Sequence, residues 1–501
     1  MNSTFLSLAV VVVVLVFSMK MLADKEIRKT VACWTLIGIS LGVCKSLLIQ
    51  MTPQWLDTPL DSLIYQHHAQ ALFLHWTGQS VDANVYELAG LLNMWTHGGH
   101  PVWLPTDQIP YAGVFGSHEW IFSGLLGLWT LAGNSLASAI IANSILTGAF
   151  PAAAYIITRE LGGPPKVCHF AALLVALEPS IALNSAWLLK DTLATLLCMV
   201  VIISACQLCN KPTLKFASIL AVSLGFLAAV KYVAFISFCM VFCVLALYFV
   251  VKKPRATAAA FVSASMAAVM IWGVLYYVPF EQKLTQPATV ATAPLPAKAT
   301  PAQVEQVLTA APPAKTTPPA APSASKPTET ASFSLTTTVT TTLKAQATTL
   351  QGQTTTLTAT ANEEGADGSV IGWRSYLHDQ PVSALARAVV RTLLAPYPWV
   401  ALTHGLAGNN QLELYMLAAT TWVIALPGTL LGLIIMARRN LKTLMLVALL
   451  GIIAVAYIVF FGEWSTRQRV FMMPVMYSFS ALGWYWLWRM KERPRLRPAL
   501  V

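Results

Sequence analysis

Charged residues are scarce in this chain of 501 residues. Asp, Glu, Lys and Arg make up 11% of it, whereas hydrophobic residues make up 56%. Soluble domains carry about 25% charged residues, so the composition excludes an ordinary water-soluble protein. The chain has instead repeated apolar runs of roughly 18–22 residues, and about 20 residues in a helix cross a bilayer core. Because lipid offers no partner to a loose backbone group, the runs predict an all-α, polytopic integral membrane protein.

Cysteine pairing and metal-ligand spacing are also missing. The eight cysteines lie in or beside apolar runs, and the one Cys-x-x-Cys, Cys206 and Cys209, has no second pair. This excludes a disulfide framework and an ordinary zinc site. Six of the nine histidines fall within residues 52–134, but none has His-x-His or His-x-x-x-His spacing. We therefore expect no metal site and no resident cofactor, and leave open whether a divalent metal takes part.

The basic residues are unevenly placed. Lys and Arg number 32 against 21 Asp and Glu, a surplus that would suit a nucleic-acid partner. They gather, however, in short loops between apolar runs, which is the positive-inside bias of membrane proteins. We therefore expect no nucleic acid. The apolar runs and the basic clusters between them predict about eleven transmembrane helices in an inner or plasma membrane. The N-terminus is expected outside and the C-terminus in the cytoplasm.

Hydropathy and charge divide the chain into seven segments. They are residues 1–51, with two transmembrane helices; 52–134, a first extracytoplasmic loop with amphipathic helices, which we expect to hold the active site; 135–281, with transmembrane helices three to eight; 282–366, a Thr/Ala/Pro-rich segment predicted to be disordered and extracytoplasmic; 367–410, an extracytoplasmic amphipathic segment; 411–488, with transmembrane helices nine to eleven; and 489–501, a basic cytoplasmic tail.

The first extracytoplasmic loop contains no Lys or Arg, yet it carries six carboxylates. One of them, Asp61, stands four residues before Tyr65, so the two share a face if the segment is helical. A carboxylate at the membrane edge can act as a general base for a hydroxyl acceptor, because partial burial raises its pKa toward the useful range. The same acid also fits a solvated helix start, where it would face the positive end of the helix dipole.

Two further groups of charges fall at predicted outer ends of spans. Lys190 and Asp191 precede an apolar run, and ionisable residues at membrane depth indicate a functional site. A mutual ion pair that stabilises a helix corner is the other interpretation. Arg467 and Arg469 precede the final span, where two guanidinium groups can hold a phosphate. Contact with anionic lipid headgroups would explain them equally well.

Several stretches occur together in a recognisable order. They are Asp61-x-x-x-Tyr65-x-x-x-Ala69, Tyr111–Gly116 leading through Leu125–Gly133 to Thr158–Gly163, Ala171–Pro179 running to Ser185 and Lys190-Asp191, and Thr466–Arg469. In order and predicted membrane side they resemble the GT-C class of polyprenyl-phosphate-dependent glycosyltransferases, in particular bacterial relatives of protein O-mannosyltransferases and aminoarabinose transferases. The resemblance covers mainly residues 50–240 and the end of the chain.

The resemblance implies a glycosyltransferase with a polyprenyl-phosphate sugar donor and an acceptor hydroxyl on a glycan, lipid or protein. By position it makes Asp61 the general base and Asp191 a second site acid. It makes Lys190, Arg467 and Arg469 phosphate ligands, with Tyr65 beside the substrate. The chain departs from the family in two places: Asp61 lacks the adjacent acid of many members, and the Thr/Ala/Pro-rich insert matches no family pattern.

Two other functions stay open. A surface-glycan polymerase or ligase would use a lipid-linked substrate too, with its working loop late in the chain, where Arg374, Arg387 and Arg391 lie. A transporter or flippase of lipid-linked or small solutes would show ionisable groups near mid-membrane, broken helices and an internal repeat. The sequence shows no such repeat, and its charges gather at the predicted outer ends.

Overall fold

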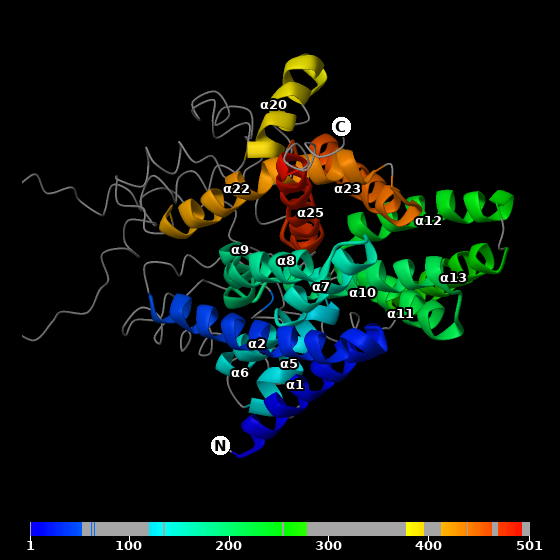
Figure 1. Ribbon diagram of the computed structural model, residues 1–501. Helices are drawn as coiled ribbons and strands as arrows, with labels where there is room; N and C mark the ends of the chain where they lie inside the picture. The colour runs from blue at the N-terminus through cyan, green and yellow to red at the C-terminus, as the bar shows by residue number, and fades with distance from the viewer. Residues whose placement is uncertain are drawn as a thin grey trace, which may run out of the picture. The chain divides into compact units, whose positions relative to one another are not determined.

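The computed structural model describes residues 2–52, 62, 65, 120–133, 136–252, 255–277, 377–394, 412–437, 439–462 and 469–492. Every regular element within these ranges is helical, which confirms the all-α class (Figure 1). The helices are α1 (Asn2–Leu22), η1 (Lys25–Ile27), α2 (Arg28–Met51), α5 (Trp120–Gly133), α6 (Leu136–Leu146), α7 (Ala149–Glu160), α8 (Pro165–Leu177), α9 (Pro179–Ala186), α10 (Asp191–Asn210), α11 (Leu214–Val230), α12 (Tyr232–Lys252), α13 (Arg255–Tyr277), α20 (Pro381–Leu394), α22 (Leu412–Met436), α23 (Leu441–Phe461), η5 (Val470–Met472) and α25 (Met473–Glu492).

Seven helical stretches in the described ranges are long and apolar enough to cross a membrane. They are Lys25–Met51, Ser138–Glu160, Asp191–Asn210, Tyr232–Val251, Arg255–Gly273, Leu417–Met436 and Leu441–Phe460. The pair α8 and α9, bent by 45°, raises the number to eight if it forms one span. The chain is therefore an α-helical membrane protein, and the count of about eleven spans stays a prediction. The apolar parts of α1 and α11 are shorter than 18 residues.

Polar clusters lie at the two ends of α10, which are named the Asp191 end and the Glu160 end. At the Asp191 end, Gln50 near the end of α2 donates to the carbonyl of Ala186, the last residue of α9. At the Glu160 end, Lys442 at the start of α23 pairs with Glu160. Which end faces the cytoplasm stays a prediction.

The last helices of the chain pack on its first half. α25 lies against α22, α7 and α8, and α23 lies against α12. In Figure 1 the orange and red helices α22, α23 and α25 accordingly lie beside green helices of the first half. This return brings residues beyond position 410 to both ends of α10.

Glycines allow the close contact between α22 and α25. A Cβ added at Gly432 would lie 2.0 Å from the carbonyl oxygen of Phe479, and one at Gly483 would lie 2.0 Å from that of Gly428. Helices in a membrane gain little from the hydrophobic effect on association, so their contact depends on close packing of small residues. The two helices meet so closely because these three positions carry no side chain.

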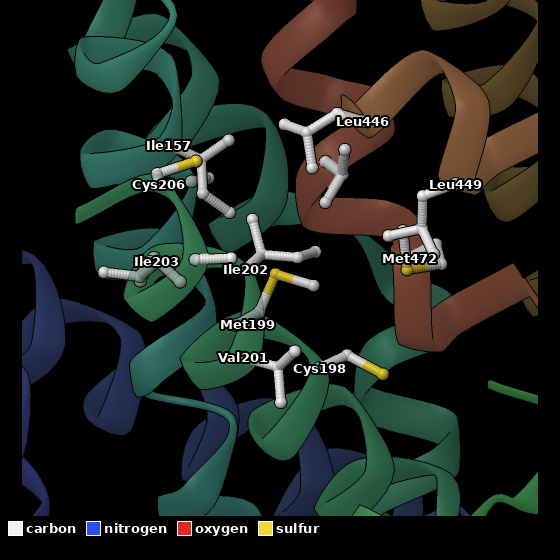
Figure 2. Close-up of a cluster of buried hydrophobic side chains, with 14 of the residues drawn as sticks. Ile157, Cys198, Met199, Val201, Ile202, Ile203, Cys206, Leu446, Leu449 and Met472 are labelled. Atoms are coloured by element: carbon white, nitrogen blue, oxygen red, sulfur yellow. The ribbon is translucent and has the colours of Figure 1, made fainter. Parts of the chain in front are cut away.

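Helix α10 lies in the middle of the main buried cluster. Figure 2 shows Cys198, Met199, Ile202 and Cys206 of α10 near Leu449 of α23 and other buried side chains. All of these side chains are almost completely buried. The cysteines act here as small apolar side chains, and all eight in the chain are free thiols. The packing fixes α10 along its length and therefore fixes where its first residue, Asp191, lies.

Candidate functional site

A break in the helix after α8 shapes the Asp191 end. The sequence pattern predicts a rise to about residue 181 followed by an outer corner, whereas the structure places the separate helix α9 within that corner. Pro179 is its first residue, and the side chain of Glu178 accepts a hydrogen bond from the backbone N–H of Ser180. Proline at the first helical position with an acceptor side chain before it is a helix-start signal, which the sequence does contain.

The chain then turns sharply between α9 and α10. Leu188 adopts a left-handed conformation with φ of 53° and is fully buried. A bulky residue in this region is strained, and such strain persists only where the surrounding packing enforces it. The turn reverses the chain so that Lys190 and Asp191 stand at the start of α10.

Asp191 forms a buried ion pair with Lys231. The Lys231 Nζ donates to Asp191 Oδ1 at 2.5 Å, and both side chains are largely buried. Lys231 lies between α11 and α12, donates to the hydroxyl oxygen of Tyr457 on α23, and stands 5.3 Å from the ring centre of Phe471. The charge of Asp191 also faces the positive end of the α10 dipole. The ion pair therefore joins α10 to the link between α11 and α12, and Lys231 extends this connection to Tyr457 on α23.

The partners of Lys231 keep it charged. Burial opposes the positive charge, but the attraction of the Asp191 carboxylate and of the Tyr457 oxygen outweighs it and raises the pKa of Lys231 above its ordinary value. An ammonium group that is held protonated in this way neutralises Asp191 at any physiological pH. Asp191 thus has a cationic partner that the sequence interpretation did not include, because Lys231 lies 40 residues further along the chain. A mutual ion pair of Lys190 and Asp191 stays a prediction.

Lys190 lies beside Tyr65, which belongs to the segment predicted to be the first extracytoplasmic loop. Its Nζ lies 5.6 Å from the ring centre of Tyr65, and Tyr65 in turn packs edge-on against Phe122 of α5 at 5.3 Å. Ser62 donates a hydrogen bond to the carbonyl of Trp187, next to the turn that carries Lys190. The structure therefore brings together two of the predicted site residues, Tyr65 and Lys190, beside a third, Asp191. Asp61 lies outside the described residues.

Arg469 binds the end of an amphipathic helix. Its Nη1 donates to the carbonyl of Thr392 at 2.9 Å, and its guanidinium lies 4.4 Å from the ring centre of Trp422. Trp422 donates to the carbonyl of Leu393, so both side chains hold the last turn of α20, which carries the negative end of its dipole. The side chain is 1% exposed. Its proposed contact with a donor phosphate stays a prediction, as does that of Arg467, which lies outside the described residues.

Glu178 is a buried acid that the sequence did not single out. It is 1% exposed at the break between α8 and α9. Its Oε1 accepts from the backbone N–H and hydroxyl of Ser180, and its Oε2 accepts from the hydroxyls of Thr421 and Tyr477. Four donors satisfy the charge that burial would otherwise make costly. The signal that was available is an acid followed by Pro179 inside a bilayer-length apolar run.

Lys45 closes the same break from α2. Its ammonium group donates to the carbonyls of Ala176 and Glu178 at 2.8 and 3.1 Å. These carbonyls lie at the end of α8, where the helix leaves them without a partner of its own. Lys45 therefore supplies donors to the broken backbone and places a positive charge near the Glu178 carboxylate.

A second polar cluster lies at the opposite end of the bundle. Glu160 pairs with Lys442 at 2.5 Å and also accepts hydrogen bonds from the side chains of Gln207 and Asn210, at 2.9 and 3.0 Å. It joins α7, α10 and α23. Its carboxylate oxygens are thus occupied by three donors from two other helices, α10 and α23, which is the pattern of a structural clamp.

The described part of the chain contains no group of three or more His, Cys, Asp or Glu side chains placed to hold a metal ion. No known protein family matches the sequence, and no curated protein shows significant similarity to it. The residues that bear on function are therefore those at the Asp191 end, where Tyr65, Lys190 and Asp191 lie together.

Proposed function

We propose that the chain is a membrane glycosyltransferase that moves a sugar from a polyprenyl-phosphate donor to an acceptor hydroxyl on the extracytoplasmic side. The observation that supports this proposal most is the position of Lys190, whose ammonium group faces the ring of Tyr65. Two sequence motifs that lie 125 residues apart thereby meet at one end of the bundle, at Lys190 and Tyr65.

In this proposal Lys190 holds the donor phosphate. Its side chain is only partly buried, so a ligand can reach its ammonium group. A lysine ammonium group is a compact charge that binds phosphate without the fixed geometry of a guanidinium. The ion pair of Asp191 with Lys231 favours a positioning role for Asp191, because it fixes the first turn of α10 and so the place of Lys190.

The reaction needs a base and a stabilised leaving group. Asp61 removes the proton from the acceptor hydroxyl while its oxygen forms a bond to the anomeric carbon of the sugar. The bond between that carbon and the phosphate oxygen breaks, and the polyprenyl phosphate leaves with the electron pair. Lys190 stabilises the negative charge that grows on the leaving phosphate. The proton ends on Asp61 and passes to water.

Mass analysis of surface glycans, in cells with and without this chain, tests the proposed class of function. We expect a glycan, glycolipid or glycoprotein to lose a sugar in the cells that lack the chain, and to regain it when the chain is restored. An unchanged set of glycans contradicts the proposal.

A transporter is the second candidate, and the broken helix α8–α9 is the observation that favours it. The two helices are bent by 45°, and the buried carboxylate of Glu178 lies at the break. Broken helices with ionisable groups line ion and substrate sites in many secondary transporters. Altered uptake of a solute, with unchanged glycans, in the cells that lack the chain would select this function over the first.

A further inference from the structure

Polar side chains from three helices meet at the end of α9. The hydroxyl oxygen of Ser46 on α2 lies 2.8 Å from that of Ser185. Asn143 on α6 donates from Nδ2 to the backbone carbonyl of the same Ser185 at 3.0 Å. Gln50 on α2 donates from Nε2 to the carbonyl of Ala186 at 2.8 Å. Four side chains therefore gather on two consecutive residues of α9, and we call these four the α9 polar cluster.

The α9 polar cluster is deeply buried. Asn143 and Ser185 are 0% exposed and Ser46 is 1% exposed, and the Oε1 atom of Gln50 is buried as well. Helices α2 and α6 both belong to stretches that are long and apolar enough to cross a membrane. A ligand held among side chains as deeply buried as these is an ion or a water molecule, because a larger molecule would need a cavity.

The two carboxamides of the cluster each keep one oxygen unpaired. Among the residues that the structure describes, no donor faces Asn143 Oδ1 or Gln50 Oε1. Their nitrogens must be the atoms that face α9, because an oxygen there would meet a second acceptor. The oxygen and nitrogen of a carboxamide are about 2.3 Å apart, so each free oxygen lies within roughly 5.5 Å of the α9 carbonyl oxygen that its nitrogen binds. An unpaired carbonyl is costly inside a membrane, which points to a ligand.

The partial charges at the cluster share one sign. Helix α9 ends at Ala186, so the negative end of its dipole lies here. The nitrogens of Asn143 and Gln50 and the hydroxyl of Ser185 all donate to carbonyls of α9, which leaves oxygen lone pairs in the cluster. A water molecule would satisfy the two free oxygens but would add another oxygen to the group. A cation is attracted by every member of it.

The nearby charges favour a monovalent cation. The cluster contains no carboxylate, whereas protein sites for Ca²⁺ and Mg²⁺ ordinarily include at least one. Lys45 precedes Ser46 in the chain, but its ammonium group donates to the carbonyls of Ala176 and Glu178, before α9 begins. The eight residues of α9 extend about 12 Å, so this ammonium group is directed at the opposite end of the helix.

We propose that the α9 polar cluster binds one Na⁺ ion. Its ligands are the free oxygens of Gln50 and Asn143 and the hydroxyl oxygens of Ser46 and Ser185. Carbonyl oxygens at the C-terminal end of a half-helix coordinate Na⁺ in broken membrane helices, and α9 is the second half of such a pair, bent by 45° from α8. Burial between three packed helices favours Na⁺ over the larger K⁺. The inference goes beyond the proposed function and does not depend on it.

Three forms of the full chain, purified in mild detergent, test this assignment. They are the wild type, Gln50→Met, which removes one ligand oxygen, and the matched control Gln207→Met. Gln207 also donates a hydrogen bond between helices, but to Glu160 at the other end of α10. Equilibrium dialysis with radioactive ²²Na⁺ measures the bound ion, in competition with unlabelled Na⁺, K⁺ or choline. Circular dichroism and gel filtration check that each variant folds.

We expect wild type and Gln207→Met to bind one Na⁺ per chain, with K⁺ at least tenfold weaker as a competitor and choline without effect. Gln50→Met should bind Na⁺ about tenfold more weakly, because the ion loses one of its oxygen ligands. Absence of Na⁺ binding by wild type overturns the assignment and leaves the free oxygens to ordered water only. Equal competition by K⁺, or an equal loss in both variants, overturns it too.

A second measurement stands even if Gln50→Met fails to fold. Amide hydrogen exchange of the wild-type chain is compared in NaCl, KCl and choline chloride at equal concentrations. Slower exchange of residues 179–187 in NaCl alone, with unchanged exchange in α12, supports the proposal. The same exchange of these residues in all three salts contradicts it.

Discussion

Lys231 and Asp191, which lie 40 residues apart in the sequence, form a buried ion pair with a distance of 2.5 Å. The pair fixes the start of α10, and the hydrogen bond from Lys231 to Tyr457 fixes α23 beside it. Lys190, the residue before Asp191, is thereby directed toward Tyr65. The proposed phosphate site thus depends on a cation that does not itself touch the substrate.

Replacing Lys231 with Met should destabilise the fold, because it removes the Lys231 charge from beside the buried Asp191 carboxylate. Loss of one partner of a buried ion pair costs about 3–5 kcal/mol. The double variant Lys231→Met with Asp191→Asn should recover a large part of this loss, since it leaves no buried charge. Thermal unfolding in detergent measures both. Equal destabilisation of the single and double variants would argue against the ion pair.

Replacing Lys190 with Gln should lower the rate of sugar transfer while the fold keeps its stability, since Lys190 is not fully buried. A lost hydrogen bond from a charged donor costs about 1.5–3 kcal/mol, which is tenfold or more in rate. Lys211 stands at the other end of α10 and is exposed, so Lys211→Gln is the matched control. Similar transfer rates for the two variants would show that Lys190 is not part of the phosphate site.

Replacing Glu178 with Gln should destabilise the α8–α9 break by about 1–3 kcal/mol, because an amide accepts less strongly from Thr421 and Tyr477 and brings donors of its own. Tyr477→Phe removes a single donor and should cost less. Thermal unfolding compares the two. A Glu178→Gln variant that is as stable as wild type, yet no longer takes up a solute, would favour the transporter.

Replacing Gly432 with Ala should separate α22 from α25, because the new Cβ would lie 2.0 Å from the Phe479 carbonyl oxygen. Overpacking of this kind costs about 1–3 kcal/mol. Gly451→Ala is the control, since its Cβ meets open space and Ala favours helix by up to about 1 kcal/mol. The order of unfolding temperatures should be Gly451→Ala at or above wild type, with Gly432→Ala below both.

The helices could be predicted from the sequence because hydropathy is a local property. The run that becomes α12 contains 20 apolar or small residues in succession, and a run of this length has few other folds available in a membrane. The amphipathic segment predicted at residues 367–410 contains α20 for the same reason. Hydropathy alone does not separate helix α9 from its neighbours, although the sequence contains the Glu178-Pro179 start signal.

The partners of the buried charges could not be predicted from sequence patterns. Glu178 accepts hydrogen bonds from Thr421 and Tyr477, which lie 243 and 299 residues away in the chain. Periodicity carries no information about such pairs, since they arise only when α22 and α25 return to α8. The pairing of Asp191 with Lys231, 40 residues further along the chain, has the same origin.

The most direct test of the central claim is sugar transfer by an Asp61→Asn variant. Wild type and variant are reconstituted in vesicles with a labelled polyprenyl-phosphate sugar and membrane extract as the source of acceptor, and transfer to the acceptor is counted over time. We expect the variant to fold like wild type and to lose transfer, because an amide cannot take the acceptor proton. Turnover equal to that of wild type would contradict the account.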